Sequence, residues 1–256
     1  MLRRRHFLAT LTAALPAAAS DLEVIAHRGE HIACPENTIP AIQKAIDLGC
    51  HWVEIDVRTT RDGHFVLMHN ATVDATTSGQ GAVAEMTLAE IRALDAAVSK
   101  PQFRGTRVPT LDEALAVMRG KCGVYFDAKQ IAAEAIAAAL QRHGMLQRCV
   151  VYGSLPLLKE LTQLGHPQLA MPEAVSVELA ARSLKELAPR TMAFDRRDFR
   201  PQVIAVARAA GKGVFVDRLG AEDTPDHWRE AVRLGATGIQ TGHPAQLLAL
   251  RLVKLA

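Results

Sequence analysis

The stretch Val53–Glu54–Ile55–Asp56–Val57 alternates apolar residues with two carboxylates. In an extended strand, alternate side chains share a face, so Glu54 and Asp56 would point the same way, about 6.5–7 Å apart along the strand. Burial and like-charge repulsion both disfavour such a pair, and a bound cation relieves both. All-oxygen ligation favours a hard divalent ion, Mg2+ or Ca2+. On this stretch alone, an edge strand whose polar side chains face solvent remains an alternative.

Around this stretch, strand-like and helix-like segments alternate along the chain. Eight main strands are predicted, at residues 23–26, 52–57, 123–128, 149–152, 169–171, 191–194, 213–216 and 237–240. A doubly wound sheet rarely needs eight such units, whereas a (β/α)8 TIM barrel does. We therefore expect an α/β protein in which residues 21–256 form a single (β/α)8 domain, with its functional residues at the C-terminal ends of the strands.

Residues 70–108 interrupt the alternation. They are rich in Thr, Ser, Gly and Ala, contain one short helical piece at 88–94, and follow an additional strand at 65–68. We interpret them as a small inserted loop region after the second main strand. The next helix opens at Thr110, with Glu113 at the capping-box position, and an earlier helix over 38–48 has Asn37 or Thr38 as its cap.

The first 20 residues have the pattern of an export signal. Arg3, Arg4 and Arg5 precede an apolar run, and small residues follow at 17–19. The sequence Arg4–Arg5–His6–Phe7–Leu8 resembles the core of a twin-arginine signal. We expect export, with a periplasmic location, although an amphipathic first helix or an uncleaved anchor remains open.

Composition restricts the partners. The formal net charge is +3, and residues 1–20 contribute three Arg and no acid, so the mature chain would be neutral. With 4% aromatic residues and no large basic patch, nucleic acid is not an expected partner. No apolar run after the first residues is long enough for a membrane span. The four cysteines form no CxxC pair, which argues against a zinc or redox motif.

The candidate functional residues all lie at or near the C-terminal ends of predicted strands. They are His27 and Arg28 after the first strand, Glu54 and Asp56 in the second, His69 after the additional strand, and Asp127 and Lys129 at the end of the strand over 123–128. Three carboxylates would hold one divalent cation, while Arg28 and Lys129 would help to neutralise a phosphate. Two histidines can serve as general base and general acid across a displacement at phosphorus.

These residues carry a family resemblance. The sequence resembles the glycerophosphodiester phosphodiesterase family, a group of TIM barrels related to the phosphatidylinositol-specific phospholipases C. The matching motifs are His27–Arg28–Gly29, Pro35–Glu36–Asn37–Thr38, Glu54–Ile55–Asp56–Val57, Thr60–Arg61–Asp62–Gly63, His69, Pro109–Thr110–Leu111–Asp112–Glu113 and the stretch from Gly235 to Thr241.

The resemblance implies hydrolysis of a small-molecule glycerophosphodiester to glycerol 3-phosphate and an alcohol, with Mg2+ or Ca2+. It implies that Glu54, Asp56 and Asp127 bind the metal and that His27 and His69 form the acid–base pair. Arg28, Lys129 and Asn37 would bind the phosphate or support the metal site. The assignment of acid and base, and the choice between water and a substrate hydroxyl as nucleophile, stay open, as does the oligomeric state.

The chain also departs from the family pattern. Asp127 stands where Glu is usual, and Asn70 follows His69 where Asp is frequent. The seventh strand often carries Trp–Thr–Val and here reads Val214–Phe215–Val216–Asp217–Arg218, and a Thr–Asp–x–x–x–Pro motif is replaced by Thr241–Gly242–His243–Pro244. Asp217, Arg218 and His243 would therefore either tune the preference for the alcohol head group or be ordinary loop residues.

Two other functions fit the same residues. One is a lysophospholipase D-like phosphodiesterase or lyase on the same scaffold, which would need an apolar loop facing the membrane. The other is a non-catalytic periplasmic binding protein that keeps the fold, for which Asp127 is the main support. Metal-dependent turnover separates the second alternative from the enzymes.

Overall fold

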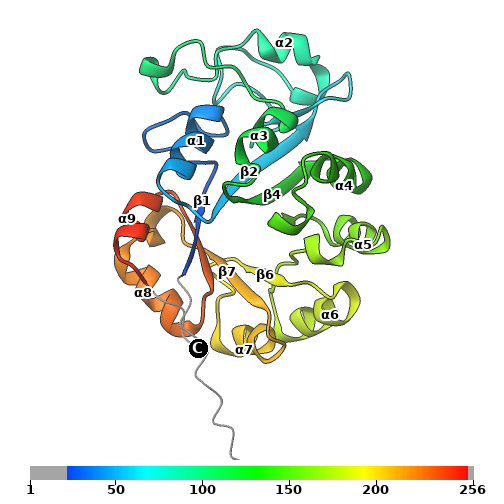
Figure 1. Cartoon of the computed structure of the whole chain (residues 1–256), viewed down its shortest axis with the longest axis vertical. Coiled ribbons are helices and arrows are strands. Elements are labelled where there is room, and N and C mark those ends of the chain that lie inside the picture. The colour runs from blue at the N-terminus through cyan, green and yellow to red at the C-terminus, as the bar shows by residue number, and fades with distance from the viewer. Residues whose placement is uncertain (1–21, 253–256) are drawn as a thin grey trace, which may run out of the picture.

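The computed structural model describes residues 22–252, and parallel strands dominate it. Among these residues, seven parallel strands pair in the order β5-β4-β2-β1-β8-β7-β6. Their bounds are β1 (Glu23–Ala26), β2 (Trp52–Thr59), β4 (Gly123–Gln130), β5 (Cys149–Tyr152), β6 (Thr191–Phe194), β7 (Gly213–Asp217) and β8 (Gly238–Thr241). The first strand pairs with the last, so the sheet curls into a nearly closed barrel (Figure 1).

The remaining gap, between β5 and β6, is filled by an irregular segment. The sequence predicts a strand at 169–171, and this prediction is wrong in detail: a 3₁₀ helix covers Pro167–Leu169, and only single bridges form at Ala170 and Glu173. Pro172 explains the irregularity, because proline has no N–H to donate to a ladder. Its carbonyl still accepts from the Ala193 N–H at 2.9 Å, so the segment joins the edges of the barrel. The (β/α)8 class is thus confirmed, and this irregular segment takes the place of the eighth strand.

Helices cover the outside of the barrel (Figure 1). They are α1 (Ile39–Asp47), α3 (Leu111–Met118), α4 (Ala133–Arg142), α5 (Leu155–Gln163), α6 (Val177–Leu187), α7 (Pro201–Ala209), α8 (Pro225–Leu234) and α9 (Pro244–Ala249). Their apolar faces pack on the outward side chains of the strands to form the main core, for example Ile136 of α4. Thr38, and not Asn37, is the N-cap of α1, and the predicted capping box of Thr110 and Glu113 opens α3.

The lower interior of the barrel is filled by a separate cluster that includes Ile25, Trp52, Tyr125 and Phe215. The indole of Trp52 fits there only because residue 123 is glycine: a Cβ at Gly123 would lie 2.3 Å from Trp52 Cε3. These large side chains fill the barrel interior as far as Tyr125. The next inward positions along β2 and β4 are left to polar residues at the C-terminal mouth.

The strand β3 (Phe65–Leu67) lies beside the barrel and runs antiparallel to β2, with Val57 opposite Leu67. It leads into the predicted insertion, which contains α2 (Leu88–Arg92) and 3₁₀ helices at Val83–Glu85 and Pro101–Phe103. This region has its own small core, made of Val66, Met68, Val73, Val83, Ile91, Ala96 and Val108. The chain therefore folds back so that residues after β3 return to the barrel mouth.

The predicted export signal at 1–20 lies outside the described residues. Among residues 22–252, none of the helices is both long enough and apolar enough to cross a membrane.

Candidate active site

A tight turn after β1 carries the first site residues. Arg28 and Gly29 both have left-handed backbone conformations, with φ of 53° and 77°. A side chain at Gly29 would be strained by that φ and would also place its Cβ 2.7 Å from the backbone of Ala41, so glycine is required there. The turn directs the Arg28 N–H at Glu54 Oε2, 2.7 Å away. The His–Arg–Gly motif thus fastens the end of β1 to a carboxylate of β2.

Glu54, Asp56 and Asp127 come together as the sequence predicts. Each offers a carboxylate oxygen, and these oxygens lie within 4.8 Å of one another. The reason is register: Glu54 and Asp56 share the inward face of β2, and Asp56 pairs with Asp127 on the neighbouring β4. Burial, followed by the charges of Asp56 and Asp127, raises the pKa of Glu54 well above its usual value, and burial also raises the pKa of Asp127.

Such a cluster fits a hard divalent cation. Its donors are all carboxylate oxygens, and like charges held together away from water are relieved by a bound cation. The aspartate at position 127 reaches the cluster despite being one methylene shorter than glutamate. The residues present therefore suit the metal that the sequence predicts.

The side-chain amide of Asn37 makes two hydrogen bonds to Asp56. Its Nδ2 donates to Asp56 Oδ2 at 2.7 Å, and its Oδ1 accepts from the Asp56 N–H at 3.1 Å. Asn37 adopts φ 53°, a conformation that asparagine tolerates better than most residues. Its contacts place it behind the carboxylate cluster.

Two cationic side chains balance the carboxylates. The Arg28 guanidinium lies 3.5 Å from Asp56 and 3.0 Å from Glu36. Lys129 Nζ lies 2.6 Å from Asp127 and 3.3 Å from Asp56. Although burial lowers the pKa of Lys129, its hydrogen bond to Asp127 and the two negative charges raise the pKa overall. Both cations sit at the edge of the cluster, on the cavity that a phosphate would enter.

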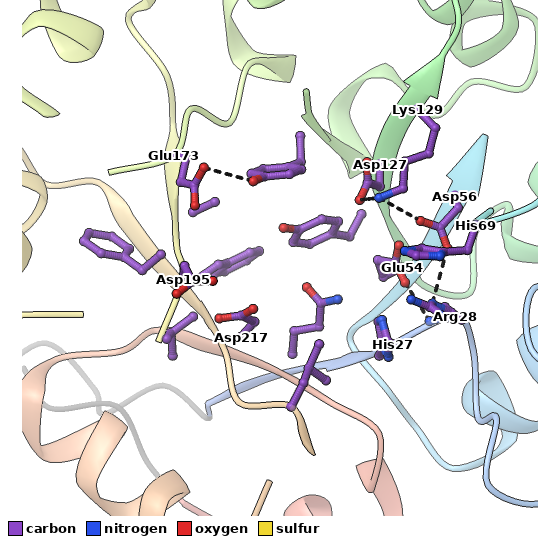
Figure 2. Close-up of a pocket in the computed structure, with 18 residues that line it drawn as sticks. His27, Arg28, Glu54, Asp56, His69, Asp127, Lys129, Glu173, Asp195 and Asp217 are labelled. Atoms are coloured by element: carbon purple, nitrogen blue, oxygen red, sulfur yellow. Dashed lines mark hydrogen bonds and ion pairs between the residues drawn. The ribbon is translucent and has the colours of Figure 1, made fainter. Parts of the chain in front are cut away.

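The two predicted histidines line the same cavity (Figure 2). Burial, followed by the charge of Arg28, lowers the pKa of His27 to about 2, so its imidazole is neutral at neutral pH. His69 reaches the mouth because β3 runs back along β2, where the Met68 N–H donates to the Asp56 carbonyl at 3.0 Å. Its Nδ1 lies 2.8 Å from Asn70 Oδ1, so Asn70 orients the ring.

The cavity has a volume of about 210 Å³ and extends beyond the predicted residues. Figure 2 shows the histidines and the carboxylate cluster on one side and Glu173, Asp195 and Asp217 on the other. Tyr125, Tyr152 and Gln240 also line it. Of the three residues considered as tuning the head group, Asp217 lines the cavity. Arg218 instead pairs with Glu222 and lies over the ring of Phe199, and neither it nor His243 is among the described lining residues.

Sequence reasoning considered Asp217 but missed Asp195 and Tyr125, although the signal for both was present. Asp195 follows β6 directly, and Tyr125 lies two positions before Asp127 on the same face of β4. The barrel rule that located the first seven candidates applies equally to these positions. Glu173 carried no such signal, because Pro172 interrupts the strand on which it would have been placed.

Comparison with known proteins agrees with this site. Residues 27–143 match the sequence profile of the Glycerophosphoryl diester phosphodiesterase family. The segment contains both histidines, the three carboxylates, Arg28 and Lys129. A glycerophosphodiester phosphodiesterase of Caldanaerobacter subterraneus is 48% identical over 99 residues, which is 38% of this chain and 41% of that protein. The matched segments thus span less than half the length of such curated relatives.

Solved structures extend the likeness to the whole barrel. A glycerophosphodiester phosphodiesterase from Agrobacterium tumefaciens superposes with a TM-score of 0.80 at 28% identity, covering 89% of this chain and 99% of that one. A phosphodiesterase from Oleispira antarctica gives a TM-score of 0.78 over 90% of this chain and 96% of that one, and its 24% identity supports the fold alone. Profile, relatives and structures agree with the assembled motifs, and together they support a place for residues 27–143 in the glycerophosphoryl diester phosphodiesterase family.

Proposed function

We propose that this protein hydrolyses glycerophosphodiesters to glycerol 3-phosphate and an alcohol, with one divalent cation, Mg2+ or Ca2+. The observation that carries the proposal is the meeting, in one cavity, of a three-carboxylate cluster, two cationic side chains and two histidines. The names of the curated relative from Caldanaerobacter subterraneus, which this chain matches over part of its length, and of the Agrobacterium tumefaciens structure support the same reaction.

Glu54, Asp56 and Asp127 would hold the cation. When bound, it would neutralise charge on the phosphate and polarise a phosphoryl oxygen. Arg28 would bind a phosphate oxygen through its guanidinium, and Lys129 would stand between the carboxylates and the phosphate as a second positive charge. Asn37 would keep Asp56 in its ligating orientation through the two hydrogen bonds of its amide.

We assign the general base to His27, because its partly buried imidazole lines the cavity beside the carboxylate cluster, where the phosphodiester would lie. The nucleophile is a water or the substrate's own glycerol hydroxyl, and in both cases its proton passes to His27 as the new P–O bond forms. His69, oriented by Asn70, would donate a proton to the departing alkoxide, which leaves as a neutral alcohol. Each displacement forms one P–O bond and breaks one. Attack by water gives glycerol 3-phosphate directly, whereas attack by the glycerol hydroxyl gives a cyclic phosphate, which a water then opens to glycerol 3-phosphate in a second displacement.

The test is release of glycerol 3-phosphate from glycerophosphoglycerol and glycerophosphocholine by the wild-type protein in EDTA, Mg2+ or Ca2+. We expect release only with metal. His27→Ala and His69→Ala should each reduce kcat by 10²-fold or more, by roughly the contribution of one acid–base group. The matched control is His64→Ala, because the His64 side chain is 56% exposed in the turn after β2 and lines no part of the cavity.

Full activity in both histidine variants would contradict the assigned acid–base pair. Absence of turnover on every diester with every metal would favour the non-catalytic alternative. Release of a lysophosphatidic acid-type product from lysophospholipids, in preference to glycerol 3-phosphate release, would favour the lysophospholipase D-like alternative.

A further inference from the structure

The wall of the cavity opposite the carboxylate cluster is acidic and belongs to no step of the proposed reaction. Glu173 lies on the segment between β5 and β6, Asp195 follows β6, and Asp217 ends β7. Figure 2 shows all three facing the cavity from the side away from His27 and Lys129. We call Glu173, Asp195, Asp217, Tyr125 and Tyr152 the acidic subsite.

The charges of this subsite are poorly balanced within the protein. Asp195 pairs with Arg197, whose side chain is 76% exposed. Glu173 accepts only a hydrogen bond from Tyr152 Oη at 3.1 Å, and Asp217 only the Arg196 N–H at 2.9 Å. Among residues 22–252, no cationic side chain lies within ion-pair distance of Glu173 or Asp217. The carboxylates of Glu173 and Asp217 therefore face the cavity without an ion-pair partner among the described residues.

Polar groups facing the cavity also lack partners. The residues Tyr125 and Gln240 are only 7% and 8% exposed, and both line the cavity. Neither makes a side-chain hydrogen bond to any other described residue. Their polar atoms are therefore open to the cavity and available to a polar ligand there. This observation is independent of the carboxylates and favours a polar ligand on the same side.

Aromatic rings complete the wall. Tyr125 and Tyr152 have ring centroids 6.4 Å apart, and Phe194 and Phe215 line the cavity nearby. Aromatic faces together with carboxylates are the surroundings that favour an organic cation. The whole cavity is lined by six carboxylates and only two cationic side chains, Arg28 and Lys129. A divalent cation and a phosphate would still leave an excess of negative charge, which a positive head group would reduce.

We propose that the acidic subsite binds the positively charged amino-alcohol head group of the substrate, so that the protein prefers zwitterionic glycerophosphodiesters such as glycerophosphocholine and glycerophosphoethanolamine. This inference rests on the proposed function, because it requires the phosphodiester to lie at the carboxylate cluster. The alternative occupant is the glycerol moiety, whose hydroxyls would donate to the same carboxylates whatever the head group.

The experiment compares kcat/KM for glycerophosphocholine, glycerophosphoethanolamine and the neutral-headed glycerophosphoglycerol, at pH 7.5 with the metal that supports turnover. We expect the wild type to prefer the two cationic head groups by tenfold or more. Asp217→Asn and Asp195→Asn should remove most of that preference through KM and leave glycerophosphoglycerol within twofold. Asp47→Asn is the matched control, because Asp47 makes an exposed contact to Gln43 at the far end of α1.

A wild type without preference overturns the inference. An equal loss on all three substrates in Asp217→Asn also overturns it, since that outcome assigns the carboxylates to the glycerol moiety. Calorimetric binding to His27→Ala keeps the test independent of turnover. If no diester is hydrolysed but glycerophosphocholine binds at least tenfold more tightly than glycerophosphoglycerol, the subsite stands and the proposed function fails. If neither binds, the subsite fails.

Discussion

At the scale of single residues, Asn37 shows how a motif residue can act through another side chain. It does not cap the helix that follows it. Its amide instead bridges the carboxylate and the N–H of Asp56, which is 1% exposed. Asn37→Gly removes the amide without forcing a Cβ into the left-handed backbone. We expect this variant to lose about 1–3 kcal/mol of unfolding free energy, because the Asp56 N–H loses its acceptor and Asp56 Oδ2 loses a hydrogen bond.

The measurement is urea unfolding in EDTA and with the divalent cation, together with the metal concentration needed for half-maximal activity. That concentration should rise, since a supporting residue of this kind typically changes metal affinity by about 10–100-fold. Gln43→Ala, which removes the exposed contact to Asp47, serves as the control and should stay within about 0.5 kcal/mol of wild type. An unchanged metal requirement in Asn37→Gly would show that Asp56 needs no such support.

At the scale of elements, the insertion matters because it holds the chain on either side of His69. Val66 and Met68 belong to the small core of this region, and fully buried Ile91 of α2 packs in the same core. Ile91→Ala should destabilise by about 2–5 kcal/mol, as a large-to-small change in a packed core. We expect kcat to fall as well, at temperatures where the barrel remains folded, because loosening this core releases β3 and with it His69.

The matched variant is Ile136→Ala, which makes the same change in the fully buried outer core under α4. It should cost a similar free energy by urea unfolding but leave kcat nearly unchanged below the melting transition. If both variants lose activity in proportion to stability, the insertion has no special part in positioning His69.

At the scale of the whole molecule, the negative charges gathered around the cavity lower the folding stability. The effect can be measured at Asp217, because its pKa is raised. Burial, followed by the charge of Asp195, raises the pKa of Asp217 to about 6. The other groups that act on it are Arg196 and Arg218, while its own charge raises the pKa values of Tyr125 and Tyr152. A carboxyl group whose pKa is raised in the folded state does not destabilise the fold at a pH where it is protonated in both the folded and the unfolded chain. Its full destabilising effect appears above pH 6, where it is ionised in both states.

Asp217→Asn removes that charge and keeps an oxygen to accept from the Arg196 N–H. We therefore expect the variant to melt about 2–6 °C higher than wild type at pH 7.5, with the difference vanishing by about pH 4. Differential scanning calorimetry in EDTA across this range checks the window. A lower melting temperature at pH 7.5 would mean that the Asp217 carboxylate stabilises the fold. That result would contradict the view that its charge is poorly balanced by the protein.

Much of this protein was determined by local pattern. The alternation of apolar and polar residues and the helix caps were enough to predict the barrel. One side of the cavity followed from side chains near the C-terminal ends of predicted strands, namely His27, Glu54, Asp56, Asp127 and Lys129. They sufficed because strand periodicity sets the face of a side chain, and parallel strands bring their ends to one rim. The capping box at Thr110 is likewise a short-range interaction within four residues.

Other features depend on contacts between distant segments, so only the tertiary structure could decide them. The antiparallel return of β3 brings His69 to Asp56, and the backbone of Arg28 reaches Glu54 across 26 residues. The irregular segment around Pro172 places Glu173 at the cavity although no regular strand precedes it. The acidic wall appears only when β6, β7 and that segment close around the cavity, because charge and burial are properties of the assembled space rather than of any single stretch of sequence.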